Sequence, residues 1–78
     1  HIEPQVVEVF GDQAAVWAKE RSGLGERLEV AGDTAFFYCR DTAPLLAALV
    51  NEPVLRYMHR AATLEDVFIK LTGRELRD

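Results

Sequence analysis

The sequence predicts an α+β domain in which helices pack on one face of an antiparallel sheet. Two observations support this class. Short runs of β-branched and aromatic residues alternate with segments rich in Ala and Leu, and turn-forming residues separate them. The chain has 78 residues, of which 49 % are apolar. This suits one small core and excludes a large multi-step enzyme.

The first two predicted elements are a strand and a helix. Residues 4–10 predict a strand because four of them are β-branched Val or aromatic Phe. Asp12 offers a cap for a helix over residues 13–21, and Gly23 is the predicted stop signal.

A hairpin follows. Residues 27–31 and 34–40 predict strands around Gly32-Asp33, where Gly at the first central position suits a two-residue type II′ turn. The turn fixes the register of the two strands. The predicted pairs are Ala31 with Thr34, Val30 with Ala35, Glu29 with Phe36, Leu28 with Phe37 and Arg27 with Tyr38.

This register sorts the hairpin side chains onto two faces, because side chains alternate along a strand. One face carries the apolar set Leu28, Val30, Phe37 and Cys39, which we expect to face the core. The opposite face carries Arg27, Glu29, Phe36 and Tyr38.

A second helix and a fourth strand complete the predicted sheet. Asp41-Thr42 supplies cap oxygens and Pro44 fits the first turn of a helix that includes residues 45–50. Residues 54–60 predict a strand with both faces partly covered. The resulting βαββαβ order is that of a ferredoxin-like sheet with two helices on one face.

The C-terminal residues predict an extra helix. Thr63 is its cap and Gly73 its stop, and apolar residues recur at helical spacing. We expect this stripe either to cover the open face of the sheet or to dock on another domain. The stripe consists of Leu64, Val67, Phe68 and Leu71.

Residues for catalysis or metal binding are scarce. Cys39 is the single cysteine, so it cannot form an intrachain disulfide, which favours a reducing compartment and hence the cytoplasm. A Cys39–His59 nucleophile pair is conceivable in three dimensions, but no orienting third group is evident. The sequence also lacks a phosphate-binding G-x-x-x-x-G-K-[ST] loop and metal-ligand spacing. We therefore expect no catalytic, cofactor-binding or metal-binding residue.

Charge and chain ends narrow the possible partners. The formal charge of −4 argues against nucleic acid, and no window is apolar and long enough to span a membrane. RNA binding remains an alternative through stacking on Phe36, Tyr38 and Tyr57. The chain does not begin with Met, so we expect it to be a piece of a longer protein.

The C-terminal residues resemble a family signature. The run Ser/Thr/Asn-Leu-Glu-Asp-Val-Phe, followed by Leu-Thr-Gly-Arg, closes many ATP-binding subunits of bacterial ABC-2 type exporters. Within that family the chain is most similar to the nodulation-factor export subunits, with weaker likeness around residues 6–11 and 27–32. Here the signature reads Thr63-Leu64-Glu65-Asp66-Val67-Phe68 and Leu71-Thr72-Gly73-Arg74.

The resemblance implies a single C-terminal regulatory or interaction domain, residues 1–78, that follows an ATPase domain absent from this sequence. ATP and Mg²⁺ would belong to that absent domain. The implied partners are the ATPase domain itself, a second copy and a separate membrane permease subunit. The parent would lie in the cytoplasm at the inner face of the bacterial membrane and drive export of a lipo-oligosaccharide or a drug-like amphiphile.

Within the signature, packing and capping explain Thr63, Leu64, Phe68, Leu71 and Gly73. The residues left over are our candidates for contact with the ATPase domain or a second copy. They are Glu65, Asp66, Ile69 and Arg74. A solvated capping face explains these four equally well, and a small-molecule-sensing module of the same fold is the main alternative function.

Overall fold

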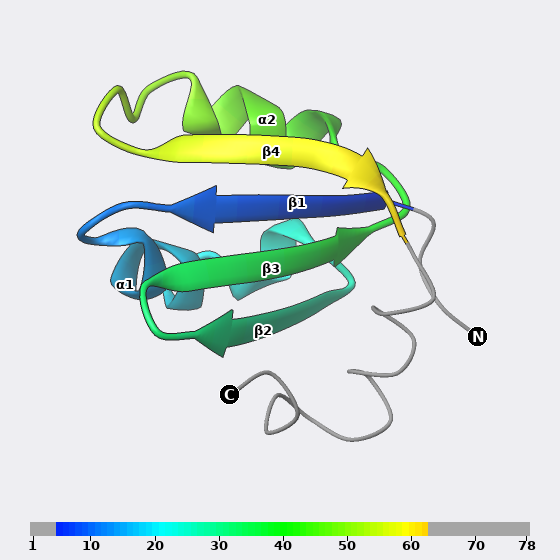
Figure 1. Ribbon diagram of the computed structural model, residues 1–78. Coiled ribbons are helices and arrows are strands. Elements are labelled where there is room, and N and C mark those ends of the chain that lie inside the picture. Colours follow the sequence, from blue (N-terminus) through cyan, green and yellow to red (C-terminus); the bar gives the residue numbers. More distant parts are fainter. Residues whose placement is uncertain (1–4, 63–78) are drawn as a thin grey trace.

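A computed structural model describes residues 5–62 as one four-stranded sheet with two α-helices and a short 3₁₀ helix (Figure 1). The α+β class and the antiparallel sheet are confirmed. The predicted C-terminal helix falls on residues 63–78, outside the described residues. The elements are β1 (Gln5–Phe10), α1 (Ala14–Lys19), η1 (Ser22–Leu24), β2 (Arg27–Ala31), β3 (Thr34–Cys39), α2 (Ala43–Leu49) and β4 (Arg56–Ala61).

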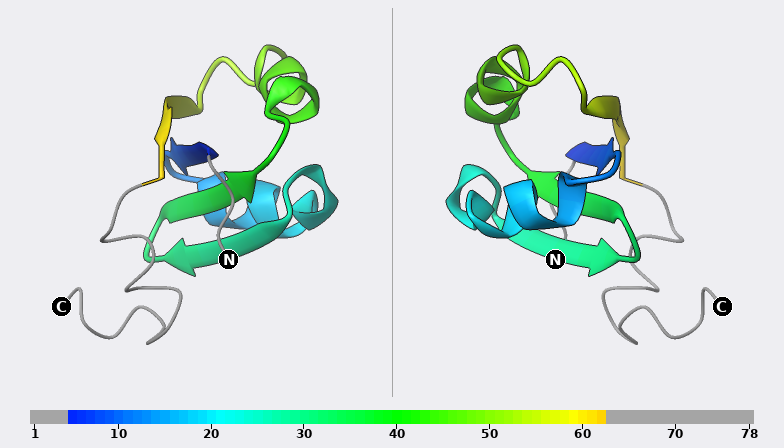
Figure 2. Two further views of the ribbon diagram at one scale, coloured as in Figure 1. Left: turned by 90° about the vertical axis from the view of Figure 1, so that its right-hand side faces the viewer. Right: turned by 90° about the vertical axis from the view of Figure 1, so that its left-hand side faces the viewer.

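The strands lie in the order β2-β3-β1-β4, and all neighbours are antiparallel. Strand β3 therefore separates β1 from β2, and β1 separates β3 from β4. Figure 2 shows α1, η1 and α2 on one side of the sheet. We call the opposite side the helix-free face, since the described residues place no helix there.

The hairpin prediction is confirmed in full. The observed β2–β3 pairs run from Ala31 with Thr34 to Arg27 with Tyr38. Gly32 has a φ of 62°, while no non-glycine residue described has positive φ. Positive φ at the first central residue alone is the pattern of a type II′ turn.

The main core lies between the sheet and the helices. Val7, Val9 and Phe37 contribute from the central strands and have no exposed surface. The Trp17 ring of α1 meets Phe37 edge to face, with ring centroids 6.4 Å apart. Helix α2 adds Leu45 and Leu49, so both helices are held by burial of apolar side chains.

The helix ends differ in part from the predictions. Asp12 does not cap α1: the helix begins at Ala14, whose N–H donates to the Gly11 carbonyl at 3.1 Å. The Gly11 carbonyl thus accepts from a first-turn N–H group that a capping side chain would otherwise bind. The predicted stop at Gly23 is also wrong, since α1 ends at Lys19 and Gly23 lies in η1.

Helix α2 uses the predicted cap region. The Ala43 N–H donates to Asp41 Oδ1 at 3.1 Å, whereas Thr42 forms no side-chain cap bond. Pro44 stands in the first turn as predicted. Its missing N–H is no loss there, because the first N–H groups of a helix have no partner within the helix.

Strand β4 begins two residues later than predicted, and most of its residues are exposed. The Leu55 N–H donates to the Glu52 carbonyl at 3.0 Å, which extends the turn after α2 and delays the strand to Arg56. The prediction that both faces are partly covered is confirmed, because Tyr57 on the helix side and Met58 on the helix-free face are 47 % and 50 % exposed. Among residues 5–62, β4 is an edge strand whose single strand neighbour is β1.

Gly25 generates the first prediction, because it packs against β3. A Cβ placed there would lie 3.2 Å from Phe37 Cδ1 and 3.3 Å from both Cys39 Sγ and the Tyr38 carbonyl oxygen. We expect Gly25→Ala to lower the free energy of unfolding by about 1–2 kcal/mol in urea denaturation, since overpacking displaces neighbours.

Gly23→Ala is the matched control, because a Cβ there would have no atom within 4 Å. Its effect should stay within about 0.5 kcal/mol. Equal effects of the two substitutions would contradict a packing role for Gly25.

Candidate functional site

The interaction residues predicted from the signature cannot be placed on the fold. They are Glu65, Asp66, Ile69 and Arg74, and they lie outside the described residues. The same holds for the structural signature residues Thr63, Leu64, Phe68, Leu71 and Gly73. A functional site is therefore sought on the surfaces of residues 5–62.

Cys39 and His59 do not form a nucleophile pair. Cys39 lies opposite Gln5 and His59 opposite Val7, on strands that β1 separates. At about 4.8 Å between strands, their backbones are about 10 Å apart or more. Cys39 is buried in the main core, while the His59 Nε2 lies 2.7 Å from Gln5 Oε1.

The described residues hold no group of three or more His, Cys, Asp or Glu side chains that could bind a metal ion. Among residues 5–62, no helix combines the length and apolarity needed to cross a membrane.

The helix-free face has an apolar centre formed by Val6, Phe36 and Tyr38, which are 0 %, 8 % and 1 % exposed. We call these three residues the second cluster. Ala31 and Ala62 pack against it from opposite ends of the sheet. Hence the sheet is buried on both sides in its central region.

Charged side chains border the second cluster on both sides. On β2, Arg27 pairs with Glu29, and the Arg27 guanidinium lies 3.8 Å from the centre of the Tyr38 ring. Across the cluster, Arg60 Nε of β4 lies 2.7 Å from Glu8 Oε2 of β1. These ion pairs confine the apolar area to the middle strands.

This geometry does not provide the stacking platform considered for RNA. Phe36 and Tyr38 share the helix-free face but are buried. Tyr57 is 47 % exposed but pairs with Val9, a main-core residue, and so lies on the helix side. Base stacking needs rings that are exposed together on one face.

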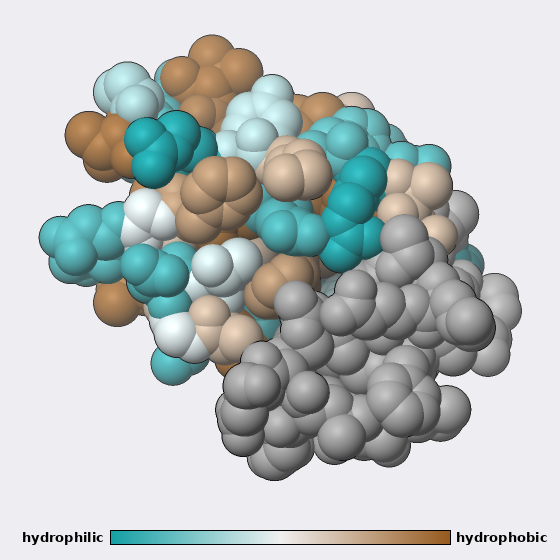
Figure 3. Space-filling view, in the orientation of Figure 1, coloured by the Kyte–Doolittle hydropathy of each residue, from teal (hydrophilic) through white to brown (hydrophobic). Residues whose placement is uncertain are grey.

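The sequence did not predict an exposed apolar surface at the end of α2 and on β4. Val50 and Val54 are each 80 % exposed, and Tyr57 and Met58 are 47 % and 50 % exposed. These four residues, which we call the apolar edge, belong to the end of α2, the α2–β4 connection and β4. Figure 3 shows apolar surface over the α2–β4 end of the molecule. Within the described part of the chain, these side chains adjoin the side of β4 that has no strand neighbour, and exposed apolar side chains at such an edge are typical of protein contact sites.

Comparison with known proteins identifies the family of this chain. Residues 7–73 match the family model of the nodulation factor export protein NodI, C-terminal domain. The chain belongs to this family. The match begins within β1 and includes the other three strands and all of the C-terminal signature except Arg74.

Full-length relatives of the NodI C-terminal domain bear the name Nod factor export ATP-binding protein I. The protein from Cupriavidus metallidurans is 56 % identical over 73 residues, which cover 94 % of this chain and 24 % of the relative. The protein from Ralstonia nicotianae is 49 % identical over 79 residues, covering 94 % and 25 %. The chain thus spans about a quarter of the curated relatives it matches, and no solved structure matches it.

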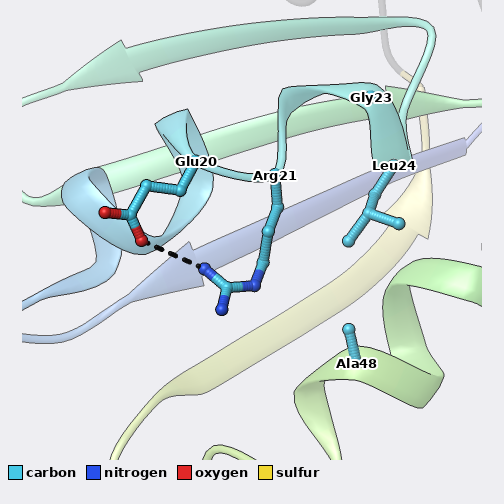
Figure 4. Close-up of a pocket in the computed structure, with 5 residues that line it drawn as sticks. All are labelled: Glu20, Arg21, Gly23, Leu24 and Ala48. Atoms are coloured by element: carbon cyan, nitrogen blue, oxygen red, sulfur yellow. Dashed lines mark hydrogen bonds and ion pairs between the residues drawn. The ribbon is translucent and has the colours of Figure 1, made fainter.

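The structure also has a groove between α1–η1 and α2 (Figure 4). Leu24 and Ala48 face each other across it. The Arg21 guanidinium is engaged by Glu20 at 3.4 Å, by the Trp17 carbonyl at 3.2 Å and by the Trp17 ring at 4.9 Å. The groove is lined by Gly23, Leu24 and Ala48 together with Glu20 and Arg21, whose charges pair with each other.

Burial of Cys39 generates the second prediction. In the folded chain we expect the Cys39 thiol to react with a disulfide reagent at least about 100-fold more slowly than in the urea-unfolded chain, because reaction requires local opening. His59→Ala should leave the native rate unchanged. Fast native labelling that this substitution abolishes would instead indicate a nucleophile pair.

Proposed function

We propose that this chain is the non-catalytic C-terminal domain of an ABC exporter's ATP-binding subunit and that it helps the ATPase to dimerise or be regulated. The proposal is supported by membership of the NodI C-terminal family and by relatives that are named Nod factor export ATP-binding proteins. The single structural observation that carries it is the apolar edge, which is suited to contact with another protein surface.

On this proposal, ATP and Mg²⁺ bind to the ATPase domain that precedes the chain in the parent subunit. The sequence itself contains no Walker-type phosphate loop, so hydrolysis is assigned to that domain. The parent would work with a separate membrane permease at the cytoplasmic face of the membrane. The export substrate would be a lipo-oligosaccharide or a drug-like amphiphile.

The apolar edge has two features of a docking surface. Val50 and Val54 expose branched apolar side chains next to the start of β4, where burial by a partner would be favourable. Strand β4 also has a free side, because β1 is its only strand neighbour among the described residues. Its exposed Arg56 adds a positive charge that favours an acidic partner surface.

The third prediction tests the apolar edge in the parent subunit. We expect Val54→Asp to weaken association with the ATPase domain or a second copy by about tenfold, or about 1.4 kcal/mol, because a buried contact is replaced by a charge. Dimerisation measured by analytical ultracentrifugation and ATPase activity as a function of protein concentration would report this change.

Val16→Asp is the matched control, since Val16 is likewise an exposed valine (54 %, against 80 % for Val54) but lies on α1 outside the apolar edge. It should leave association unchanged. If the two variants behave alike, the apolar edge is not the contact surface.

The fourth prediction concerns the signature residues. Charge reversal by Glu65→Lys or Arg74→Glu should weaken dimerisation of the parent subunit several-fold, because each reversal replaces an attraction across the contact by a repulsion. The 78-residue chain carrying either change should keep its circular dichroism spectrum and unfolding midpoint. Lys19→Glu, an exposed charge reversal on α1, is the control. Unchanged association in all variants would remove these residues from the contact.

A further inference from the structure

The apolar edge presents side chains to both faces of the sheet. Tyr57 pairs with Val9, a main-core residue, and lies on the helix side. The neighbouring Met58 pairs with Glu8 and lies on the helix-free face. In the folded chain Tyr57 and Met58 are 47 % and 50 % exposed, and Val50 at the end of α2 is 80 % exposed. A partner surface that docks on one face of the sheet would therefore cover only part of the apolar edge.

An element in the plane of the sheet can contact both sets of side chains. Among residues 5–62, β4 is a border strand, and β1 is its only strand neighbour (Figure 1). All β4 residues except Arg60 are exposed, so this border is accessible in the folded chain. Alternate residues of an edge strand direct their N–H and C=O groups away from the sheet, and an extended segment can pair with these groups. Its side chains would then alternate between the Tyr57 face and the Met58 face.

The charges of β4 indicate the chemistry of such a segment. Residues 56–61 contain two Arg and one His but no Asp or Glu. Arg60 is engaged by Glu8, with Arg60 Nε 2.7 Å from Glu8 Oε2. The exposed Arg56, by contrast, takes part in no ion pair within residues 5–62. An acidic side chain opposite Arg56 would therefore add an attraction between the two chains.

The same charges oppose pairing of β4 with a second copy of itself. Antiparallel pairing about Met58 would place Arg56 of one copy directly opposite Arg60 of the other, and like charges in such positions are destabilising. Pairing about His59 would leave Arg56 beyond the paired residues. Cations on an edge strand are a device that prevents self-association. The occupant that suits this border is therefore a segment of different sequence.

We propose that β4 binds an extended, acidic segment of a partner protein by strand addition, with apolar side chains beside Tyr57 and a carboxylate opposite Arg56. The bound segment would extend the four-stranded sheet by one strand. Strand addition rests on the proposed function, because it specifies how a partner binds at the apolar edge. Recognition then uses the backbone of β4 as well as its side chains.

Amide hydrogen exchange in the 78-residue chain tests strand addition directly. The probe is a blocked seven-residue peptide that alternates valine with glutamate, and its control has lysine in place of glutamate. We expect the glutamate peptide to slow exchange at least about tenfold for those β4 amides that do not bond to β1, because they gain a hydrogen-bond acceptor. Unchanged exchange, or equal slowing by both peptides, would overturn the proposal. A free chain that sediments as a dimer with these amides already protected would also overturn it, since the occupant would be a second copy.

The fifth prediction is a reversal of peptide preference. Arg56→Glu should weaken binding of the glutamate peptide about tenfold and strengthen binding of the lysine peptide, as measured by chemical-shift titration, because the charge opposite the peptide changes sign. The matched control is Arg40→Glu. Arg40 is also exposed but follows β3, at the end of the sheet opposite Arg56, so the preference should stay unchanged. Equal effects of the two substitutions would contradict a contact at Arg56. If Arg56→Glu does not fold, the preference of the unsubstituted chain for the glutamate peptide still decides the question.

Failure of strand addition and failure of the proposed function give different results. If Val54→Asp weakens association of the parent subunit but the peptides leave β4 exchange unchanged, the apolar edge is a contact surface without strand addition. If the glutamate peptide protects β4 but Val54→Asp leaves association unchanged, strand addition holds and the role in the exporter subunit fails.

Discussion

The pairing of β1 on both of its sides is the constraint on which the rest of the structure depends. Strand β1 bonds to β3 along one edge and to β4 along the other, so its backbone donors and acceptors are satisfied without water. Val6, Val7 and Val9 are consequently free to be completely buried. Because adjacent residues point to opposite faces, this one strand contributes to both the main core and the second cluster.

Strand β3 repeats this division and gives the two faces different roles. Phe37 and Cys39 turn toward α1 and α2, where helices close the core. Phe36 and Tyr38 turn the other way, into an apolar centre bordered by the Arg27–Glu29 and Glu8–Arg60 ion pairs. Placing charge at the border keeps the apolar area confined to the two middle strands.

The described surfaces suit contact with another protein. The buried thiol of Cys39 and the separately bonded His59 leave no nucleophile pair, and the basic residues Arg21 and Arg60 are engaged by neighbouring carboxylates. The apolar edge combines exposed apolar side chains with the side of β4 that has no strand neighbour among residues 5–62. Such a surface is suited to contact with a neighbouring domain, as the proposed accessory role requires.

The sequence by itself determined the order of the four strands and two helices and the β2–β3 register, because turn chemistry and strand alternation are local. It also determined the family, through the C-terminal signature. Gly32 fixes the hairpin, and the hairpin fixes which side of β3 faces the helices. The start of α1, the late start of β4 and the exposure of the apolar edge were decided only by the tertiary structure. The two element starts depend on backbone hydrogen bonds to the Gly11 and Glu52 carbonyls. The exposure depends on which strand lies at the edge of the sheet. Neither the bonds nor the strand order can be derived from neighbouring residues in the chain.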